Sequence, residues 1–494
     1  MAVVSTLPAW ALVPSALAIV LILLSRRRPA LRETWSVLAA IAQTGLVAAL
    51  LPDVLAGHQP AWRPLTLLPG VPLELRADAF GTLFALVAST LWIATTIYSI
   101  GYTRAEQERS QTRYFASFAL CLFSTVGLAL SGNLLTFYVF YELLTLGGYP
   151  LVVHRETPEA FRAGRVYLLY TLTAGLLLLI AIVWTGRLAG RLDFVPGGLL
   201  AGVEAPAGAL WVLFALFVAG CGVKAGLFPL HTWLPIAMVA PTPVSALLHA
   251  VAVVKAGVFG IARITGFVFG PTVLDDLGAS TALAWLAALT IVAASVGALV
   301  QDNLKRLLAF STIGQLSYIV LGAALGTPEA LTGGALHMAS HAFLKITLFF
   351  CAGAIAATAH LDRVSQLTGI GRRMPLTMAA FAVCAFMLAG LPPGVAFVSK
   401  WRLFGGAAEA GSMVGSLALM ASAVLNVAYF APIVVRSFAR GPSVGSGRAE
   451  ARPTMLVPLL ATAAAGLWLG LAPDAGGRLL TLAAMTARQV AGAP

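Results

Sequence analysis

Long apolar segments recur along the whole chain, and each is long enough to cross a lipid bilayer. A helix needs about 20 such residues to span the hydrocarbon core. Of the 494 residues, 59% are hydrophobic and 10% are charged, which argues against a water-soluble core. The predicted fold class is an all-α polytopic membrane protein of about fourteen transmembrane helices. The fourteen segments are 7–25, 35–55, 79–100, 114–131, 133–153, 165–185, 207–240, 243–267, 281–300, 304–326, 331–358, 376–410, 412–435 and 454–472.

The basic residues predict the orientation of these helices. If successive loops alternate between the two sides, one set of loops carries nineteen Lys and Arg residues, and the other set, with both termini, carries eight; four lysines within apolar segments complete the total of 31. The positive-inside rule then places the richer set in the cytoplasm and both termini on the opposite side of a bacterial-type cell inner membrane. The net charge of +12 is therefore explained by the orientation of the helices, with lipid headgroups as the expected partners of the basic residues, and not by binding to nucleic acid.

The start of the chain and its cysteines narrow the function further. The first apolar segment has no basic stretch before it and is followed by Arg26, Arg27 and Arg28, which is the reverse of a cleavable signal peptide, so we expect it to be retained. Cysteines occur singly, without CxxC spacing, and are expected to pack as small apolar residues. No Gly-rich phosphate-binding motif is present. We therefore expect no cofactor, no metal site and no enzymatic activity in this chain. The cysteines are Cys121, Cys221, Cys351 and Cys384.

Five ionisable residues interrupt the apolar segments: Glu142, Lys224, Lys255, Lys345 and Lys400. A charge at the centre of a bilayer costs roughly 2.5–3.5 kcal/mol, so such residues are functional candidates by default. A buried lysine loses affinity for its proton by desolvation and regains it beside a carboxylate. The pattern predicts movement of protons or cations.

Two apolar segments carry prolines close to a lysine. The seventh reads GVKAGLFP and contains Lys224 and Pro229, and the twelfth contains Pro392 and Pro393 shortly before Lys400. Because proline removes a helix donor, both helices should break near the middle of the membrane. Paired broken helices are typical of inverted-repeat transporters with a site at the midplane. Proline and glycine also kink membrane helices without any function, and the adjacent lysines favour the functional interpretation.

The eighth and eleventh segments add further titratable residues. The eighth contains Ser245 and His249, the latter six residues before Lys255 and thus about 9 Å along a helix. The eleventh carries His337, His341 and Lys345 on one helical face. Packing is the alternative role for a lone buried histidine, and a metal site lacks a nearby carboxylate. Three titratable groups on one stripe favour a proton path.

Four stretches resemble a known family: NLLTFYVFYELLTLGGYPLVV, GVKAGLFPLHTWLPIAMVAPTPVSALLHAVAVVKAGVFG, DNLKRLLAFSTIGQLSYIVLG and GALHMASHAFLKITLFFCAGAI. They are similar to the antiporter-like subunits of respiratory complex I, Mrp-type multisubunit cation/proton antiporters and membrane-bound hydrogenases. The resemblance implies inverted five-helix repeats, each containing a broken helix. It implies the divisions 1–112 (helices 1–3), 113–267 (helices 4–8), 279–436 (helices 9–13) and 453–494 (helix 14 and tail).

The resemblance also implies roles for the buried residues. Glu142 would be the acid that pairs with Lys224, Lys255 would be the relay in the eighth helix, and Lys400 would be the terminal site, where one complex I subunit has glutamate. His341 and Lys345 would connect Lys255 to Lys400. His337, His249 and Ser245 are secondary relay candidates, and Pro229, Pro392 and Pro393 mark the helix breaks.

The predicted function is that of a proton-translocating subunit of an Mrp-type cation/proton antiporter, most similar to the MrpD type. The lysine at position 255 and the chain length of 494 residues support that choice. One alternative is a proton-pumping subunit of complex I or of a membrane-bound hydrogenase. Another is a self-sufficient sodium/proton antiporter, and a third, from a different class, is a non-conducting membrane scaffold. Expected partners are other integral membrane subunits, the lipid bilayer, protons and Na⁺ or K⁺.

Overall fold

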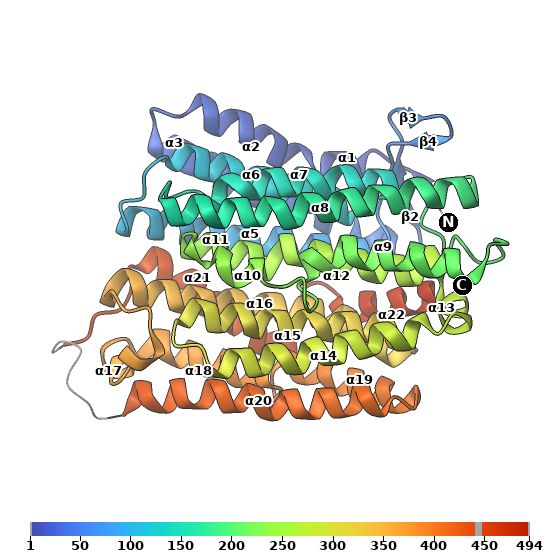
Figure 1. Ribbon diagram of the computed structural model, residues 1–494. Coiled ribbons are helices and arrows are strands. Elements are labelled where there is room, and N and C mark those ends of the chain that lie inside the picture. Colours follow the sequence, from blue (N-terminus) through green and yellow to red (C-terminus); the bar gives the residue numbers. More distant parts are fainter. Residues whose placement is uncertain (1, 440–446, 493–494) are drawn as a thin grey trace.

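The computed structural model describes residues 2–439 and 447–492, and most of its helices run side by side along one common direction (Figure 1). The helical elements are α1 (Leu7–Trp10), α2 (Val13–Leu24), α3 (Pro29–Ala48), α4 (Leu51–Leu55), α5 (Ala79–Ala105), α6 (Gln111–Ala129), α7 (Leu134–Val152), α8 (Pro158–Ala189), α9 (Ala207–Ala225), α10 (Trp233–Ile236), η1 (Ala237–Val239), α11 (Thr242–Ala246), η2 (Leu247–Val251), α12 (Val253–Arg263), η3 (Ile264–Phe269), α13 (Pro271–Asp276), α14 (Ala279–Leu299), α15 (Leu304–Leu325), α16 (Pro328–Ala359), η4 (Val364–Gln366), α17 (Ile370–Arg373), α18 (Pro375–Ala389), α19 (Val395–Glu409), α20 (Met413–Phe438), α21 (Pro453–Leu471) and α22 (Leu479–Val490).

The prediction of a polytopic helical membrane protein is confirmed. Within the described residues, thirteen helical segments are long and apolar enough to cross a membrane. The twelfth predicted segment is the exception, because it is divided into α18 and α19, of 15 residues each. With that divided segment, all fourteen predicted spans have a helical counterpart. The boundaries at 112, 267, 279, 436 and 453 lie near helix ends, and the division into repeats stays a prediction.

Both predicted helix breaks are present. The helix α9 ends at Gly226, whose φ of +73° favours glycine, and α18 ends at Gly390, whose φ is +109°. In each case the next backbone amides turn back to carbonyls of the ended helix, as Leu227 N does to Gly222 O at 3.0 Å and Leu391 N does to Phe386 O at 3.1 Å. The chain then passes the prolines before it becomes helical again.

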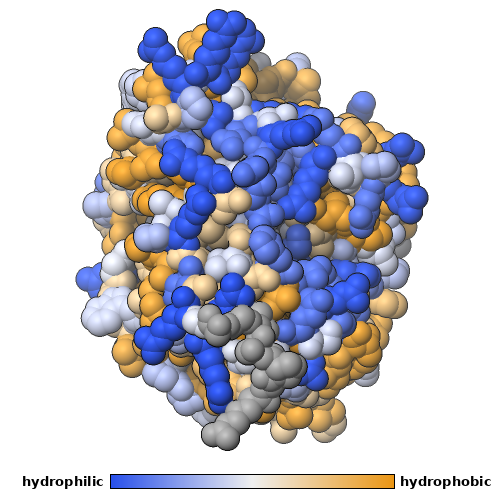
Figure 2. Space-filling view, turned by 90° about the vertical axis from the view of Figure 1, so that its left-hand side faces the viewer, coloured by the Kyte–Doolittle hydropathy of each residue, from blue (hydrophilic) through white to orange (hydrophobic). Residues whose placement is uncertain are grey.

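The loops gather at two ends of the molecule, as the alternation of basic residues predicts. At the end with the α2–α3 loop and α17, which we call the arginine-rich end, the loops are joined by ion pairs and hydrogen bonds, such as Arg155–Glu108 at 2.9 Å and Asn303–Asp362 at 3.1 Å. Figure 2 shows hydrophilic residues gathered across this end and hydrophobic residues towards its margins. Both ends of the chain lie at the opposite end (Figure 1). Arg440, one of the basic residues counted on the richer side, lies outside the described residues.

Several elements were not predicted. Short strands β1 (Ala2–Val4), β2 (Gln59–Trp62) and β5 (Leu75–Arg76) form one small sheet, and β3 (Thr66–Leu68) pairs with β4 (Val71–Pro72). Two π-helical segments, η2 and η3, flank α12, and such segments occur often at functional sites. The helix α22 packs against α5 and α16. Inside the bundle, α16 contacts elements of both halves of the chain and is buried along most of its length.

One residue of the loop count is placed differently. Arg263 was counted with the loops on the side of the termini, but it is only 1% exposed and forms two hydrogen bonds, of 2.5 and 2.8 Å, with the Asp78 carboxylate. Four phenylalanine rings surround its guanidinium group, with centroids 4.9–5.5 Å away. The pair satisfies both buried charges and ties α12 to the start of α5. The rings belong to Phe80, Phe194, Phe259 and Phe267.

Candidate functional site

Lys224 lies in the last turn of α9, just before the helix break, and its side chain is fully buried. The ammonium donates a hydrogen bond to the carbonyl oxygen of Tyr141 on α7 at 2.6 Å. It also lies 3.3 Å from the centroid of the Tyr141 ring, a cation–π contact. The Tyr141 hydroxyl in turn donates to the carbonyl of Gly220 on α9 at 2.9 Å. Tyr141 therefore holds Lys224 through both its backbone carbonyl and its ring.

Glu142 follows Tyr141 on α7 and is directed towards α8. Its Oε1 atom is buried and has no hydrogen-bond partner in the structure. The ion pairs among the described residues do not include one between Glu142 and Lys224. Gly175 on α8 makes room for the carboxylate, because a Cβ atom there would collide with Oε1. The predicted direct pairing is thus absent in this state.

The segment from α11 to α12 carries three predicted residues without hydrogen-bond partners. Ser245, His249 and Lys255 are each at most 1% exposed, and the Ser245 hydroxyl, both His249 ring nitrogens and the Lys255 ammonium are unpartnered. His249 lies in the π-helical segment η2, with its ring 5.7 Å from that of Phe349 on α16. Buried polar groups in membrane proteins need partners, so water molecules are the expected ones here.

The stripe on α16 is fully buried, and its three residues face different neighbours. His337 hydrogen-bonds through Nδ1 to Ser399 at 2.9 Å and through Nε2 to Gln315 at 3.1 Å. His341 has no hydrogen-bond partner, and its ring centroid lies 6.3 Å from that of His337. Lys345 donates to Ser311 on α15 at 2.8 Å. The predicted stripe therefore exists and extends across the bundle from α15 to α19.

Lys400 lies on α19, after the second break. Its ammonium donates to the carbonyls of Leu388 at 2.7 Å and Ala389 at 3.2 Å, at the end of α18. A cation at the carboxyl end of a helix is favourable because free carbonyls and the helix dipole meet there. The ammonium also lies 4.8 Å from the ring centroid of Tyr318 on α15. Ser399 precedes Lys400 on α19 and hydrogen-bonds to His337, so Lys400 lies next in sequence to a partner of the α16 stripe.

Sequence reasoning missed the uncharged residues that hold these groups. Ser311 accepts from Lys345 and hydrogen-bonds to Tyr429 at 2.8 Å, and Tyr429 in turn hydrogen-bonds to Asn426. These residues lie in predicted spans, where buried polar side chains are costly. Their polarity within apolar segments was the available signal. Other examples are Gln315, Tyr318 and Ser399.

The predicted residues form an interrupted series rather than one continuous chain of direct contacts. Direct hydrogen bonds join His337 to Ser399 and Lys345 to Ser311, whereas Lys255 and His341 have no direct partner. Protons could cross such gaps only through water or side-chain movement. Among the residues that the structure describes, no three His, Cys, Asp or Glu side chains are grouped to hold a metal ion.

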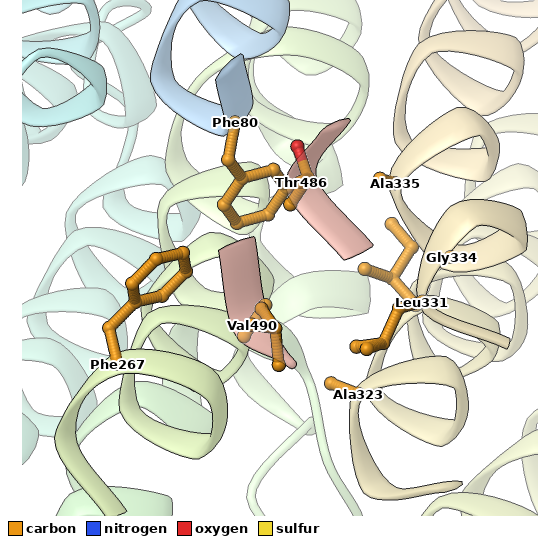
Figure 3. Close-up of a pocket in the computed structure, with 10 residues that line it drawn as sticks. Phe80, Phe267, Ala323, Leu331, Gly334, Ala335, Thr486 and Val490 are labelled. Carbon is orange, nitrogen blue, oxygen red and sulfur yellow. The ribbon is translucent and has the colours of Figure 1, made fainter. Parts of the chain in front are cut away.

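A small pocket lies one turn from His337 on α16, beside the carboxyl end of α22 (Figure 3). Its volume is about 20 Å³, which is room for one water molecule. Leu331, Gly334 and Ala335 line it from α16, and Thr486 and Val490 line it from α22. Apart from Thr486 its lining side chains are apolar, so it adds no titratable group to the site.

Comparison with known proteins shows the family to which this chain is similar. The sequence family described as "NADH:quinone oxidoreductase/Mrp antiporter, TM" matches residues 131–426. The chain is 35% identical to the N-type subunit of NADH-quinone oxidoreductase from Desulforudis audaxviator, over 88% of this chain and 89% of that protein. It is 26% identical to the D-type subunit of the Na(+)/H(+) antiporter from Bacillus subtilis, over 74% of this chain and 73% of that protein.

The fold is also shared with a solved structure. A chain of the membrane-bound sulfane sulfur reductase, an archaeal respiratory membrane complex, superposes with a TM-score of 0.89 and 26% identity. The match covers 99% of this chain and 99% of that one. The resemblance inferred from four sequence stretches is therefore confirmed and extends along almost the whole chain.

Proposed function

The chain belongs to the NADH:quinone oxidoreductase/Mrp antiporter family of membrane subunits, and on that basis we propose that it translocates protons as one subunit of a multisubunit membrane complex. The observation that carries the proposal is the row of buried titratable side chains between the two helix breaks. Four lysines and two histidines make up this row: Lys224, Lys255, His337, His341 and Lys345 are buried, and Lys400 is half-buried. Removing such groups wholly or partly from water in an apolar bundle has no structural advantage, because each must be desolvated.

In the proposed mechanism, the environment of each lysine decides whether it holds a proton. Glu142 and Lys224 form the first control point, since a carboxylate that approaches the ammonium favours its protonated form and one that retreats releases the proton. Lys255, His341 and Lys345 pass the proton across the centre, and Lys400 exchanges it at the second break. Water enters the gaps from one side at a time.

The parent complex is an Mrp-type cation/proton antiporter or a respiratory complex. The first candidate is supported by the lysine at position 255 and by the similarity to the Bacillus subtilis Na(+)/H(+) antiporter protein. The second is favoured by the 35% identity to the NADH-quinone oxidoreductase protein and by the fold of the archaeal respiratory complex. In either case we assign any redox chemistry to partner chains. We also propose that the arginine-rich end faces the cytoplasm, in a cell inner membrane.

Purification in mild detergent tests the assembly. Small membrane subunits without redox centres would identify an antiporter, and iron–sulfur or nickel proteins would identify a respiratory complex. A scaffold role makes a different prediction, because replacing Glu142 and Lys224 together by Gln and Met would then leave ion transport by the complex intact. Loss of proton transport in that double variant, with normal assembly, supports translocation.

A further inference from the structure

A cavity of about 570 Å³ opens at the arginine-rich end, beside the first break. Residues of α10 and η1, which follow the break, form one wall, and the first turns of α8 and α15 form the others. Six charged residues line it: Arg155, Glu159, Arg162, Lys305, Arg306 and Asp362. A cavity with this charge and volume holds many water molecules.

Lys305 extends from this cavity into the bundle. It is the second residue of α15 and was counted as a loop residue on the basic side, but its ammonium donates a hydrogen bond to the carbonyl of Ala240 at 2.9 Å. Ala240 immediately precedes Pro241 and α11. The lysine therefore lies between the cavity and the element that carries Ser245 and His249.

The groups next along this direction are the unpartnered ones. The Ser245 amide donates to Pro241 O at 3.1 Å, but its hydroxyl has no partner, and neither does either ring nitrogen of His249. The π-helical segment η2, which carries His249, packs against both α15 and α16, and the His249 ring lies 5.7 Å from the ring of Phe349, one turn after Lys345 on α16. A series thus runs from the cavity through Lys305 and His249 towards Lys345, with gaps that water would fill.

The chemistry of the lining selects Lys305 as the proton donor. Arginine cannot be deprotonated in proteins, so Arg155, Arg162 and Arg306 can attract or repel ions but cannot release a proton. Lysine can do so when it is removed from bulk water. Glu159 and Asp362 are the titratable acids of the cavity, and the Asp362 carboxylate already accepts a hydrogen bond from Asn303.

We propose that this cavity is the aqueous mouth of the proton path at the arginine-rich end, and that Lys305 exchanges protons between its water and His249. The proposal rests on the proposed function and adds a residue and an entrance to it. Lys305 accepts a proton from cavity water and releases it inward, so no other reactant is needed. The alternative is a structural lysine that only caps the carbonyl of Ala240.

Three variants of the intact complex in membrane vesicles distinguish these roles. Lys305→Arg keeps the charge and the donor but cannot release a proton, so we expect proton transport to fall at least tenfold, as in Lys305→Ala, with normal assembly. Arg372→Ala, an exposed basic residue outside the cavity, is the control and should transport normally. Wild-type transport by Lys305→Arg would overturn the proposal and support capping.

Rescue by small cations provides a second readout. Methylammonium can enter the cavity and exchange a proton, so it should restore part of the transport of Lys305→Ala, whereas tetramethylammonium, which has no exchangeable proton, should not. The same two cations are added to the wild-type protein and to Lys400→Ala. These controls correct for any direct effect of the cations on the pH gradient. Equal rescue by both cations, or by neither, would contradict proton exchange at this position.

A labelling experiment reads the cavity without relying on transport. The four native cysteines are buried, so a cysteine introduced at Val239 in the cavity wall should react with a membrane-impermeant maleimide added on the arginine-rich side. Absence of labelling there would refute the aqueous mouth. A complex that is labelled at this position while the wild type translocates no protons would instead refute the proposed function and leave the cavity in place.

Discussion

Replacing Glu142 by glutamine tests the control point at the first break. The structure gives Lys224 two partners that do not depend on Glu142: the Tyr141 carbonyl at 2.6 Å and the Tyr141 ring at 3.3 Å. A hydrogen bond from a charged donor contributes about 1.5–3 kcal/mol, and a desolvated cation–π contact contributes about 2 kcal/mol. Because Glu142 lies beyond 4 Å, its attraction for Lys224 is at most about 4 kcal/mol at an effective dielectric of about 20.

These magnitudes predict separate effects on folding and transport. Without the carboxylate, Tyr141 still holds Lys224, and a desolvated lysine can also shed its proton, so we expect near-normal amounts of Glu142→Gln in the membrane. Moving one charge through 100 mV involves about 2.3 kcal/mol. The lost coupling is of that size, so we expect transport to fall at least tenfold. Glu142→Asp should restore part of it.

Gly175 allows the same test without any change of charge. In Gly175→Ala the new methyl group would collide with the Glu142 Oε1 atom, so the carboxylate must move. We expect a marked loss of transport. Gly186→Ala, on the same helix, adds a methyl group at an ordinary contact distance of 3.4 Å from Leu192 and should behave as wild type. Immunoblotting and a fluorescence-quench proton assay on the same vesicles measure both quantities.

Two results would refute this reasoning. Wild-type transport by both Glu142→Gln and Gly175→Ala would remove the carboxylate from the mechanism. Loss of Glu142→Gln from the membrane would show that Glu142 neutralises Lys224 for stability, since leaving a buried charge uncompensated costs about 3–5 kcal/mol.

The other predictions concern the second break, the assembly and the buried Arg263. Lys400→Ala should abolish transport at normal abundance, and Lys400→Glu should retain some transport. The control Arg402→Gln loses only a surface ion pair with Glu329 and should transport normally. Equal loss of abundance in both Lys400 variants would mean that Lys400 has a structural role. The chain expressed alone should give no sodium-dependent proton flux in proteoliposomes, and robust flux would show a self-sufficient antiporter. Asp78→Asn should lower stability by about 3–5 kcal/mol, seen as reduced abundance or a lower unfolding temperature in detergent, with transport per surviving molecule unchanged.

The helices and their breaks could be predicted because both are local properties of the sequence. Apolar runs of sufficient length mark spans, and Pro229 and Pro393 mark positions where the helical hydrogen-bond pattern must fail. The lysines and the α16 histidines could be selected because a titratable group inside an apolar run is rare. For these features, neighbours along the chain carry the whole signal.

The partners of those residues could not be predicted in the same way. Lys224 donates a hydrogen bond to the Tyr141 carbonyl, 83 positions away in the sequence, and Arg263 pairs with Asp78, 185 positions away. Because every residue has a backbone carbonyl, the sequence does not show that the Tyr141 carbonyl accepts the hydrogen bond from Lys224. Arg263 lies in the last turn of α12, where a basic residue looks like the start of a loop.

The two breaks share one arrangement and differ in one residue. Lys224 and Lys400 each donate to backbone carbonyls and each face a tyrosine ring, Tyr141 on α7 or Tyr318 on α15. Both tyrosines lie on the second helix of their predicted repeat, so corresponding helices build the two cation environments. Beside Tyr141 stands Glu142, whereas Ser317 and Ile319 flank Tyr318. A movable negative charge can therefore alter the proton affinity at the first break, while the second has only neutral neighbours on α15. In the proposed mechanism, two sites with the same cation contacts but unequal electrostatic control differ in proton affinity during a cycle, while the driving force of the whole complex sets the direction of net movement.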